Sequence, residues 1–170
     1  MVTTLPILSD IIAGVVARIN SKTMADSVPF QVDFEFGPLS EVSKRVYAKD
    51  PGVMVIWLVE KGEDRKNVGG LYGRSQSDIV MGLQSNSHWT MTERMETNYK
   101  PKLLPVYEMF IEELRVEKLL NNPYPIDHKK YNLYYWGGGA VNGTNSNNLW
   151  EKEIDAILLE NVNLSIKNKC

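Results

Sequence analysis

Apolar residues recur at helical spacing close to the start of the chain. They are Leu5, Leu8, Ile12, Val15 and Ile19. Steps of three and four residues place them on one face, which predicts an amphipathic helix over about residues 5–20. Thr4 can cap its start and Pro6 suits its first turn, while the polar run Asn20-Ser21-Lys22 indicates its end.

A strictly alternating stretch follows at residues 31–36, Gln-Val-Asp-Phe-Glu-Phe. Its apolar side chains fall on one face and its acidic ones on the other, which predicts a half-buried strand. Helical spacing returns over residues 39–49 and predicts a short helix. Residues 53–59 are continuously apolar and rich in β-branched side chains, which indicates a central strand covered on both faces.

A long polar stretch separates this strand from the next one. Residues 60–78 contain Gly62, Gly69, Gly70 and Gly73. Polar and glycine-rich character over such a length predicts a long mobile loop. Residues 78–83 are then expected to form a strand that returns beside the previous one.

The stretch from Trp89 to Leu114 combines a polar run with an abrupt helix start. Residues 88–101 carry polar, turn-forming side chains and end in Pro101, so we expect an extended and irregular segment there. A helix is predicted to begin near Pro105, with apolar residues at positions i, i+3, i+4 and i+7. These residues are Tyr107, Phe110, Ile111 and Leu114.

Two further strands are predicted near the end of the chain. Residues 131–136 are rich in aromatic side chains, and residues 154–166 form a longer apolar strand with a bend near Glu160-Asn161. Residues 137–148 between them are rich in glycine and asparagine, which predicts a flexible connection. The two strands would therefore form a long hairpin with an extended tip.

The predicted elements follow the order α-β-α-β-β-α-β-β. Because hairpins dominate, we expect an α+β fold with a mainly antiparallel sheet and helices packed on one face. The chain has 170 residues, enough for one domain with a sizeable core, so residues 1–170 are assigned to a single domain. Mobile loops are expected at about residues 60–78 and 137–148.

The charge balance and the cysteine content narrow the function classes. The net charge is −2, from 19 basic and 21 acidic residues, whereas a general nucleic-acid binder has a basic surplus. The lone cysteine, Cys170, rules out a framework of internal disulfides. We see neither a long apolar span nor a basic leader, so we expect synthesis in a reducing cytoplasm and no membrane partner.

The sequence offers few residues that could form a catalytic, metal or phosphate site. His88 and His128 lie in different predicted loops without a second ligand at metal-binding spacing, and Ser87-His88 lacks the context of a nucleophile and its base. The glycines of residues 69–74 do not match a phosphate-binding loop. The sequence therefore predicts no enzyme, and no catalytic, cofactor-binding or metal-binding residues.

The aromatic strand at residues 131–136 has two interpretations. Aromatic side chains on a sheet can stack nucleic-acid bases, but the basic residues beside them are only Lys129 and Lys130. Tyrosine and tryptophan are also enriched in subunit interfaces. Packing in the core or at an interface is the favoured interpretation, and a nucleic-acid-binding module is the alternative.

Several short motifs together point to one family. Thr92-Glu93-Arg94 fits a T-x-x-R-like pattern, and Leu103-Leu104-Pro105-Val106-Tyr107 fits a helix start of the form L-x-P-x-Y. The D-F-E-F-G stretch at residues 33–37 and the Tyr-Tyr-Trp strand, followed by a Gly/Asn loop and Ile154-Asp155-Ala156-Ile157, fit as well. In these features the chain resembles tail-terminator and head–tail connector (neck) proteins of tailed bacteriophages.

The resemblance implies a non-enzymatic α+β subunit of the virion neck or tail. Such subunits close into rings of about six or twelve copies through heterologous contacts. Its partners would be further copies of itself and the neighbouring portal, connector or tail-tube proteins, with DNA passing through the lumen without specific binding. Two rival hypotheses are an adaptor protein without ring symmetry and a small hydrolase or transferase of unrecognised type.

The expected contact regions are the two predicted loops and the hairpin 131–166, because glycine-rich segments there border apolar or aromatic strands. The candidate interface residues are Tyr72, Arg74, Arg94, Tyr134, Tyr135, Trp136, Gly138, Asn142 and Trp150. Such segments can become ordered only in the assembly.

Overall fold

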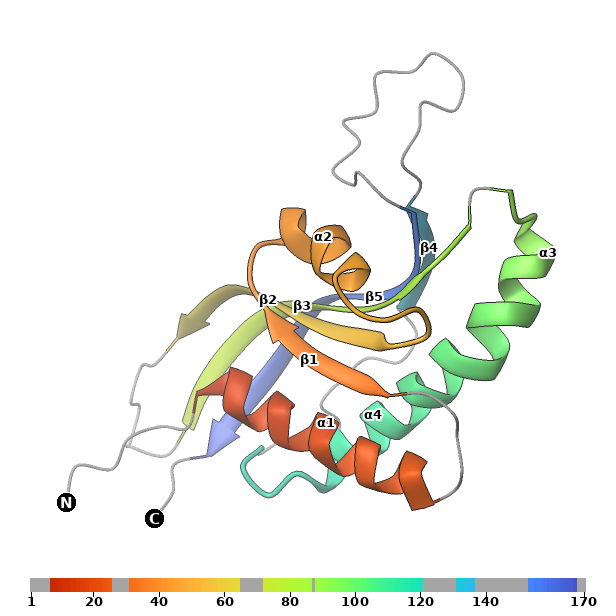
Figure 1. The fold of residues 1–170 in the computed structure, drawn as a ribbon. Coiled ribbons are helices and arrows are strands. Elements are labelled where there is room, and N and C mark those ends of the chain that lie inside the picture. The colour runs from red at the N-terminus through yellow and green to blue at the C-terminus, as the bar shows by residue number, and fades with distance from the viewer. Residues whose placement is uncertain are drawn as a thin grey trace.

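A five-stranded sheet forms the centre of the protein, with the strand order β1-β2-β3-β5-β4 (Figure 1). The computed structural model describes residues 7–25, 31–64, 72–86, 88–120, 131–136 and 153–167. The strands are β1 (Val32–Phe36), β2 (Met54–Asp64), β3 (Tyr72–Gln84), β4 (Tyr131–Trp136) and β5 (Ile154–Lys167). The sheet therefore ends in β1 on one side and in β4 on the other.

The sheet is mainly antiparallel. Only β1 and β2 run parallel, whereas the pairs β2–β3, β3–β5 and β5–β4 are antiparallel. Together with the helices this confirms the predicted α+β class, and the elements follow one another in the predicted order. The pair β4–β5 is the hairpin expected from residues 131–136 and 154–166.

Two long helices, α1 (Leu8–Ala25) and α4 (Leu104–Val116), pack side by side on one face of the sheet (Figure 1). Alternate residues of β1, β2, β3 and β5 point to this face and meet the apolar faces of the helices. The resulting main core includes Ile12, Ile19, Ile56, Ile79, Met81, Phe110, Leu114 and Ile157.

The first helix continues past the polar run that was expected to end it. α1 reaches Ala25, because all three polar side chains find partners that suit a helix. The amide of Asn20 bonds the backbone of Val32, Ser21 Oγ donates to the carbonyl of Ala17, and Lys22 pairs with Glu113. The predicted start near residue 5 lies outside the described residues.

A short helix, α2 (Val42–Tyr47), lies on the opposite face of the sheet (Figure 1). The expectation that the helices pack on one face therefore does not hold for α2. The other side of β2 and its neighbours is also apolar and needs a cover, which α2 supplies with Val42 and Val46. Trp57 is buried there, and its Nε1 donates to the carbonyl of Gly37 at 3.0 Å.

α4 is the last part of a continuous helical stretch that begins at Met91. α3 (Met91–Arg94) leads into a π-helical section, η2 (Met95–Leu103), and then into α4. The expectation of an extended segment over residues 88–101 is therefore wrong. A capping box starts the stretch: the N–H of Glu93 donates to Thr90 Oγ1 at 3.3 Å, and the N–H of Thr90 donates to Glu93 Oε2 at 2.6 Å.

Pro101 and Pro105 lie inside this helical stretch instead of ending it. In an α-helix a proline lacks the N–H donor, and its ring clashes with the carbonyl four residues earlier. Around Pro101 the helix has π geometry, in which the N–H of Leu104 donates to the carbonyl of Tyr99, five residues earlier. The wider turn accommodates the proline while Tyr99 and Leu103 stay fully buried.

β2 and β3 extend well into the segment predicted as a mobile loop, residues 60–78. β2 continues to Asp64 and β3 begins at Tyr72, and Asp64 is the register partner of Arg74. This part of β3 also pairs with β5 on its other side, so backbone hydrogen bonds hold a polar stretch in the sheet without apolar patterning. The loop prediction is wrong for both flanks, and residues 65–71 lie outside the described part of the chain.

A β-bulge interrupts β5 where the sequence predicts a bend. The register steps from Ser77↔Val162 to Ile79↔Leu159, so Asp78 alone faces two residues, Glu160 and Asn161. Asn161 has a φ of 54°, which asparagine tolerates, and its N–H donates to Asp78 Oδ1 at 2.8 Å. The irregularity expected near Glu160-Asn161 is therefore confirmed.

Candidate functional site

The chain leaves the sheet at the end of β4 and rejoins it at the start of β5. Trp136 and Ile154 are direct register partners, so the segment between them begins and ends at one place on the sheet. Residues 137–152 lie outside the described residues, and with them the candidates Gly138, Asn142 and Trp150. The structure describes the part of the fold that holds the base of this segment.

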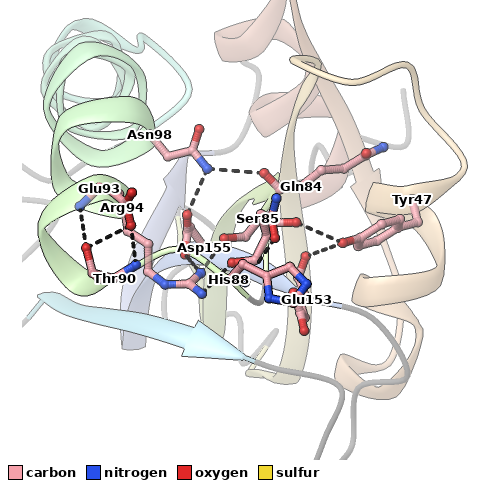
Figure 2. Close-up of polar contacts among 11 residues, drawn as sticks. Tyr47, Gln84, Ser85, His88, Thr90, Glu93, Arg94, Asn98, Glu153 and Asp155 are labelled. Atoms are coloured by element: carbon pink, nitrogen blue, oxygen red, sulfur yellow. Dashed lines mark hydrogen bonds and ion pairs between the residues drawn. The ribbon is translucent and has the colours of Figure 1, made fainter.

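Arg94 and Asp155 form a buried ion pair beside this base (Figure 2). Arg94 ends α3 and is 3% exposed, while Asp155 lies at the start of β5 and is 0% exposed. Arg94 Nη1 donates to Asp155 Oδ1 at 2.9 Å and to Ser85 Oγ, and Nη2 donates to the carbonyl of Asn86 at 2.6 Å. Such additional hydrogen bonds are what a buried charge pair requires to be tolerated.

Asn98, four residues after Arg94, binds the other oxygen of Asp155. Its Nδ2 lies 2.8 Å from Asp155 Oδ2 and 3.1 Å from the carbonyl oxygen of Gln84 (Figure 2). Helical spacing places Arg94 and Asn98 on the same face of the stretch 91–116. Together they fix the first half of this helical stretch to the ends of β3 and β5.

Tyr47 reaches the same strand ends from α2, on the opposite face of the sheet. Its hydroxyl lies 2.7 Å from the carbonyl oxygen of Glu153 and 3.2 Å from that of Ser85 (Figure 2). The N–H of Ser85 also donates to the carbonyl of Glu153 at 3.0 Å. The end of β3 and the start of β5 are therefore held from both faces. We call Tyr47, Ser85, Arg94, Asn98 and Asp155 the strand-end cluster.

The chemistry of the strand-end cluster suits positioning. Both carboxylate oxygens of Asp155 accept hydrogen bonds from buried donors, and each donor also binds a neighbouring backbone or hydroxyl oxygen. Tyr99 is buried next to it, and this burial, followed by the negative charge of Asp155, raises the pKa of its hydroxyl well above the ordinary 10.0. The cluster thus holds two strand ends and a helix in one arrangement.

A second charged network joins the two long helices. Arg18 Nε lies 2.5 Å from Glu113 Oε2, Lys22 Nζ lies 2.5 Å from Glu113 Oε1, and Arg18 Nη2 lies 2.6 Å from Glu117 Oε2. Burial alone would raise the pKa of the Glu113 carboxyl, but the hydrogen bonds from Lys22 and Arg18 outweigh it and hold the pKa below the ordinary 4.5. This network connects α1 to α4 and lies apart from the strand-end cluster.

The predicted interface residues fall at two separate places. Tyr134, Tyr135 and Trp136 lie in the edge strand β4, whose last residue pairs with the first residue of β5. Tyr72 and Arg74 lie at the start of β3 and pair with Lys167 and Ser165 near the other end of β5. The structure therefore does not gather them into one patch.

Arg94 is the one candidate residue that belongs to the strand-end cluster. Because it is 3% exposed, its side chain contacts groups inside the subunit and offers no surface to a neighbour. The structure thus assigns Arg94 to the support of the site, a different role from the surface contact we expected.

Sequence reasoning missed the partners of Arg94, although two signals were present. Asp155 is the one charged residue in the otherwise apolar run Ile154–Leu159, and a charge in a buried strand requires a buried counter-charge. Thr90 and Glu93 have the spacing of a capping box, which predicts that a helix starts at Met91. That start places Arg94 and Asn98 on one helical face. For Tyr47 we find no comparable signal.

In the part of the chain that the structure describes, no three His, Cys, Asp or Glu side chains form a group that could hold a metal ion. Among the described helices, none is both long and apolar enough to cross a membrane. No protein-family model, curated protein or solved structure matches this chain. Its function must therefore be argued from its sequence motifs and its geometry.

Proposed function

We propose that this protein is a structural virion subunit of a tailed bacteriophage, which forms a ring at the head–tail interface or the tail end. The observation that best supports this proposal is the strand-end cluster. Side chains from α2, α3 and η2 hold the base of the segment 137–152 from both faces of the sheet, and those of Arg94 and Asn98 are buried and bonded to the buried Asp155. A segment that contacts a neighbour is positioned more precisely when it is attached to rigid, well-supported elements of the fold.

The sequence motifs supply the second line of support. The stretch 89–114, the strand Tyr131–Trp136 and the Gly/Asn-rich segment 137–148 resemble neck and tail-terminator proteins. The stretch 89–114 supplies Arg94 and Asn98 to the strand-end cluster, and Trp136 is the register partner of Ile154 beside it. The stretch 89–114 and the strand Tyr131–Trp136 therefore meet at the base of the segment 137–148.

In this proposal the segment 137–148 contacts the neighbouring copy or an adjacent portal, connector or tail-tube protein. Heterologous contacts of this kind close into a ring when the rotation between copies is regular. The net charge of −2 suits a lumen through which DNA passes without being held by counterion release. The role is structural and involves no reaction.

Deleting residues 138–146 tests the proposal. The expected product folds with an unchanged midpoint of urea unfolding, because the strand-end cluster stays intact, but no longer assembles in sedimentation-velocity runs. A control variant replaces the same residues with a Gly/Ser segment of equal length. Loss of assembly in both variants assigns the contact to the side chains of the segment, and assembly retained by the deletion variant would contradict the proposal.

A further inference from the structure

The hydrogen bonds at the two ends of β1 show which of its residues direct their backbone N–H and C=O groups away from β2. The N–H of Met54 donates to the carbonyl of Gln31 at 2.9 Å, and the N–H of Gly37 donates to the carbonyl of Leu58 at 3.0 Å. In a strand the backbone groups of successive residues point to opposite sides. Odd-numbered residues of β1 therefore bond β2, and Val32, Phe34 and Phe36 direct their N–H and C=O groups outward.

The first outward position is already covered from within the subunit. Asn20 Oδ1 accepts from the N–H of Val32 at 2.9 Å, and Asn20 Nδ2 donates to the carbonyl of Val32 at 2.6 Å. A side-chain amide thus takes the place of a neighbouring strand at this residue. This pair of bonds also confirms that the backbone of Val32 points away from β2.

The next two outward positions remain open in the described part of the chain. No described residue bonds the outward backbone groups of Phe34 or Phe36. Beyond Gly37, Pro38 cannot extend this edge, because proline has no backbone N–H to donate. Phe36 is 64% exposed, and its ring stacks on that of Phe34 with the centroids 6.4 Å apart. The open edge is therefore short, apolar on one face and bounded by Asn20 and Pro38.

The same reasoning applies to β4 at the other edge of the sheet. The N–H of Ser85 donates to the carbonyl of Glu153, so odd-numbered residues of β5 bond β3 and even-numbered ones bond β4. Because Trp136 is the register partner of Ile154, the backbone groups of residues 132, 134 and 136 bond β5. Residues 131, 133 and 135 thus direct their backbone groups away from the sheet.

We propose that the open edge of β1 pairs antiparallel with β4 of a second copy of this chain. β1 and β4 run in opposite directions across the sheet, so a copy placed in the same orientation continues the sheet with an antiparallel pair. The occupant of a strand edge must itself be a strand with a free edge. Among the described strands, β1 and β4 are the two edge strands of the sheet. The strand of a second copy that can pair with β1 through a different edge is therefore β4.

This pairing rests on the proposed ring and gives that ring its contact. Two different edges meet, so the interface is heterologous and repeats from copy to copy until it closes. β4 ends at Trp136, directly before the segment 137–148, so the proposed contact of this segment and the proposed pairing of β4 concern the same neighbour. By contrast, β1 pairing with β1 about a two-fold axis would stop at a dimer and leave β4 free.

Cysteine cross-linking tests the pairing in a Cys170→Ser background. Phe36→Cys protein is mixed with Leu133→Cys protein, and parallel mixtures use cysteines at 131 and 135, under mild oxidation. The expected result is a disulfide between position 36 and one of the odd positions of β4. A chain that carries both cysteines should give a ladder of covalent oligomers that ends at the ring number.

The possible results distinguish a failure of the β1–β4 pairing from a failure of the proposed ring. Rings in native mass spectrometry without a cross-link from position 36 to β4 overturn the pairing and leave the proposed function standing. Cross-links between two cysteines at position 36 indicate a two-fold dimer and overturn the pairing as well. Monomers at every concentration, without any cross-link, overturn both proposals.

Phe36→Pro provides an independent test, because it removes an outward N–H donor and no bond to β2. We expect assembly to require at least tenfold more protein, with an unchanged unfolding midpoint. The matched control is Val116→Ser, which removes another exposed apolar side chain, 67% exposed at the end of α4, and should leave assembly as it is. Equal assembly of Phe36→Pro and wild-type protein would overturn the pairing.

Discussion

The strand-end cluster and the α1–α4 ion pairs are both built from an arginine and a carboxylate, but they differ in their surroundings. Arg94 and Asp155 are excluded from water, and the Arg94 guanidinium also donates to the hydroxyl of Ser85 and to the carbonyl of Asn86. The side chains of Arg18 and Lys22 are 43% and 52% exposed, and they approach a nearly buried Glu113 from the solvent side.

Because of this difference, the two networks have different roles in the fold. Exposed cations gain little from an ion pair and are screened by salt, so the α1–α4 network only adds to a helix contact that apolar packing already makes. A buried charge pair is strongly destabilising once one partner is lost. The strand-end cluster therefore enforces one arrangement of β3, β5 and the helical stretch 91–116, at the place where segment 137–152 is attached.

Asp155→Ala should have the largest effect, because it leaves the Arg94 guanidinium buried without its counter-charge. We expect a loss of about 3–5 kcal/mol in the free energy of unfolding, measured by urea denaturation. The double variant Arg94→Met with Asp155→Leu removes both charges and should recover much of that loss. A loss below about 1 kcal/mol for Asp155→Ala would show that the pair is hydrated and does not fix the strand ends.

Tyr47→Phe should have the next largest effect. It removes the hydroxyl that lies between the carbonyl oxygens of Ser85 and Glu153, and we expect a loss of about 1.5 kcal/mol in the free energy of unfolding. Hydrogen exchange would report the loss locally, as faster exchange of the Ser85 amide. Unchanged exchange at this amide would contradict the role given to Tyr47.

Glu113→Gln should cost about 1 kcal/mol at low salt, and less in 1 M salt, because its cationic partners are half-exposed. The folded pKa of Glu113 lies below 4.5, so its contribution is complete above that pH and is lost as the pH falls through the folded pKa. The stability difference between wild type and variant should therefore shrink on acidification below pH 4.5. A difference independent of both salt and pH would place Glu113 with the buried cluster.

Thr90→Ala should have the smallest effect, since it removes only the capping box. A loss of about 0.5 kcal/mol is expected in urea denaturation, together with fraying of residues 91–94 in hydrogen exchange. Thr90→Ser keeps the cap and serves as the control. If both variants lose equal stability, the cap is not what starts the helix.

Patterning of apolar residues predicted the order of the elements and most strands, because those elements bury one or both faces. The prediction failed where backbone geometry or pairing replaced patterning. Pro101 indicated a helix end, but π geometry accommodates it. The polar flanks of residues 60–78 are held by strand pairing, residues 60–64 by β3 and residues 74–77 by both β2 and β5. The end of α1 was misplaced because Asn20 bonds β1, a contact between segments that local sequence does not show.

The candidate site was predictable only in part. The glycines and asparagines predicted a contact region in segment 137–148, which stays a prediction, and a motif singled out Arg94 as a candidate interface residue. Its burial and its partners depend on which strand ends come together, which is a property of the sheet order β3-β5-β4. Asp155 within an apolar strand was the one local sign of that buried arrangement.

Closure into a ring through a rigidly held interface, as proposed, can be tested in solution. Native mass spectrometry over a concentration series, with negative-stain images of the same samples, tests it most directly. We expect closed rings with one defined copy number, about six or twelve. A protein that stays monomeric, or stops at a two-fold dimer across the whole series, would contradict it.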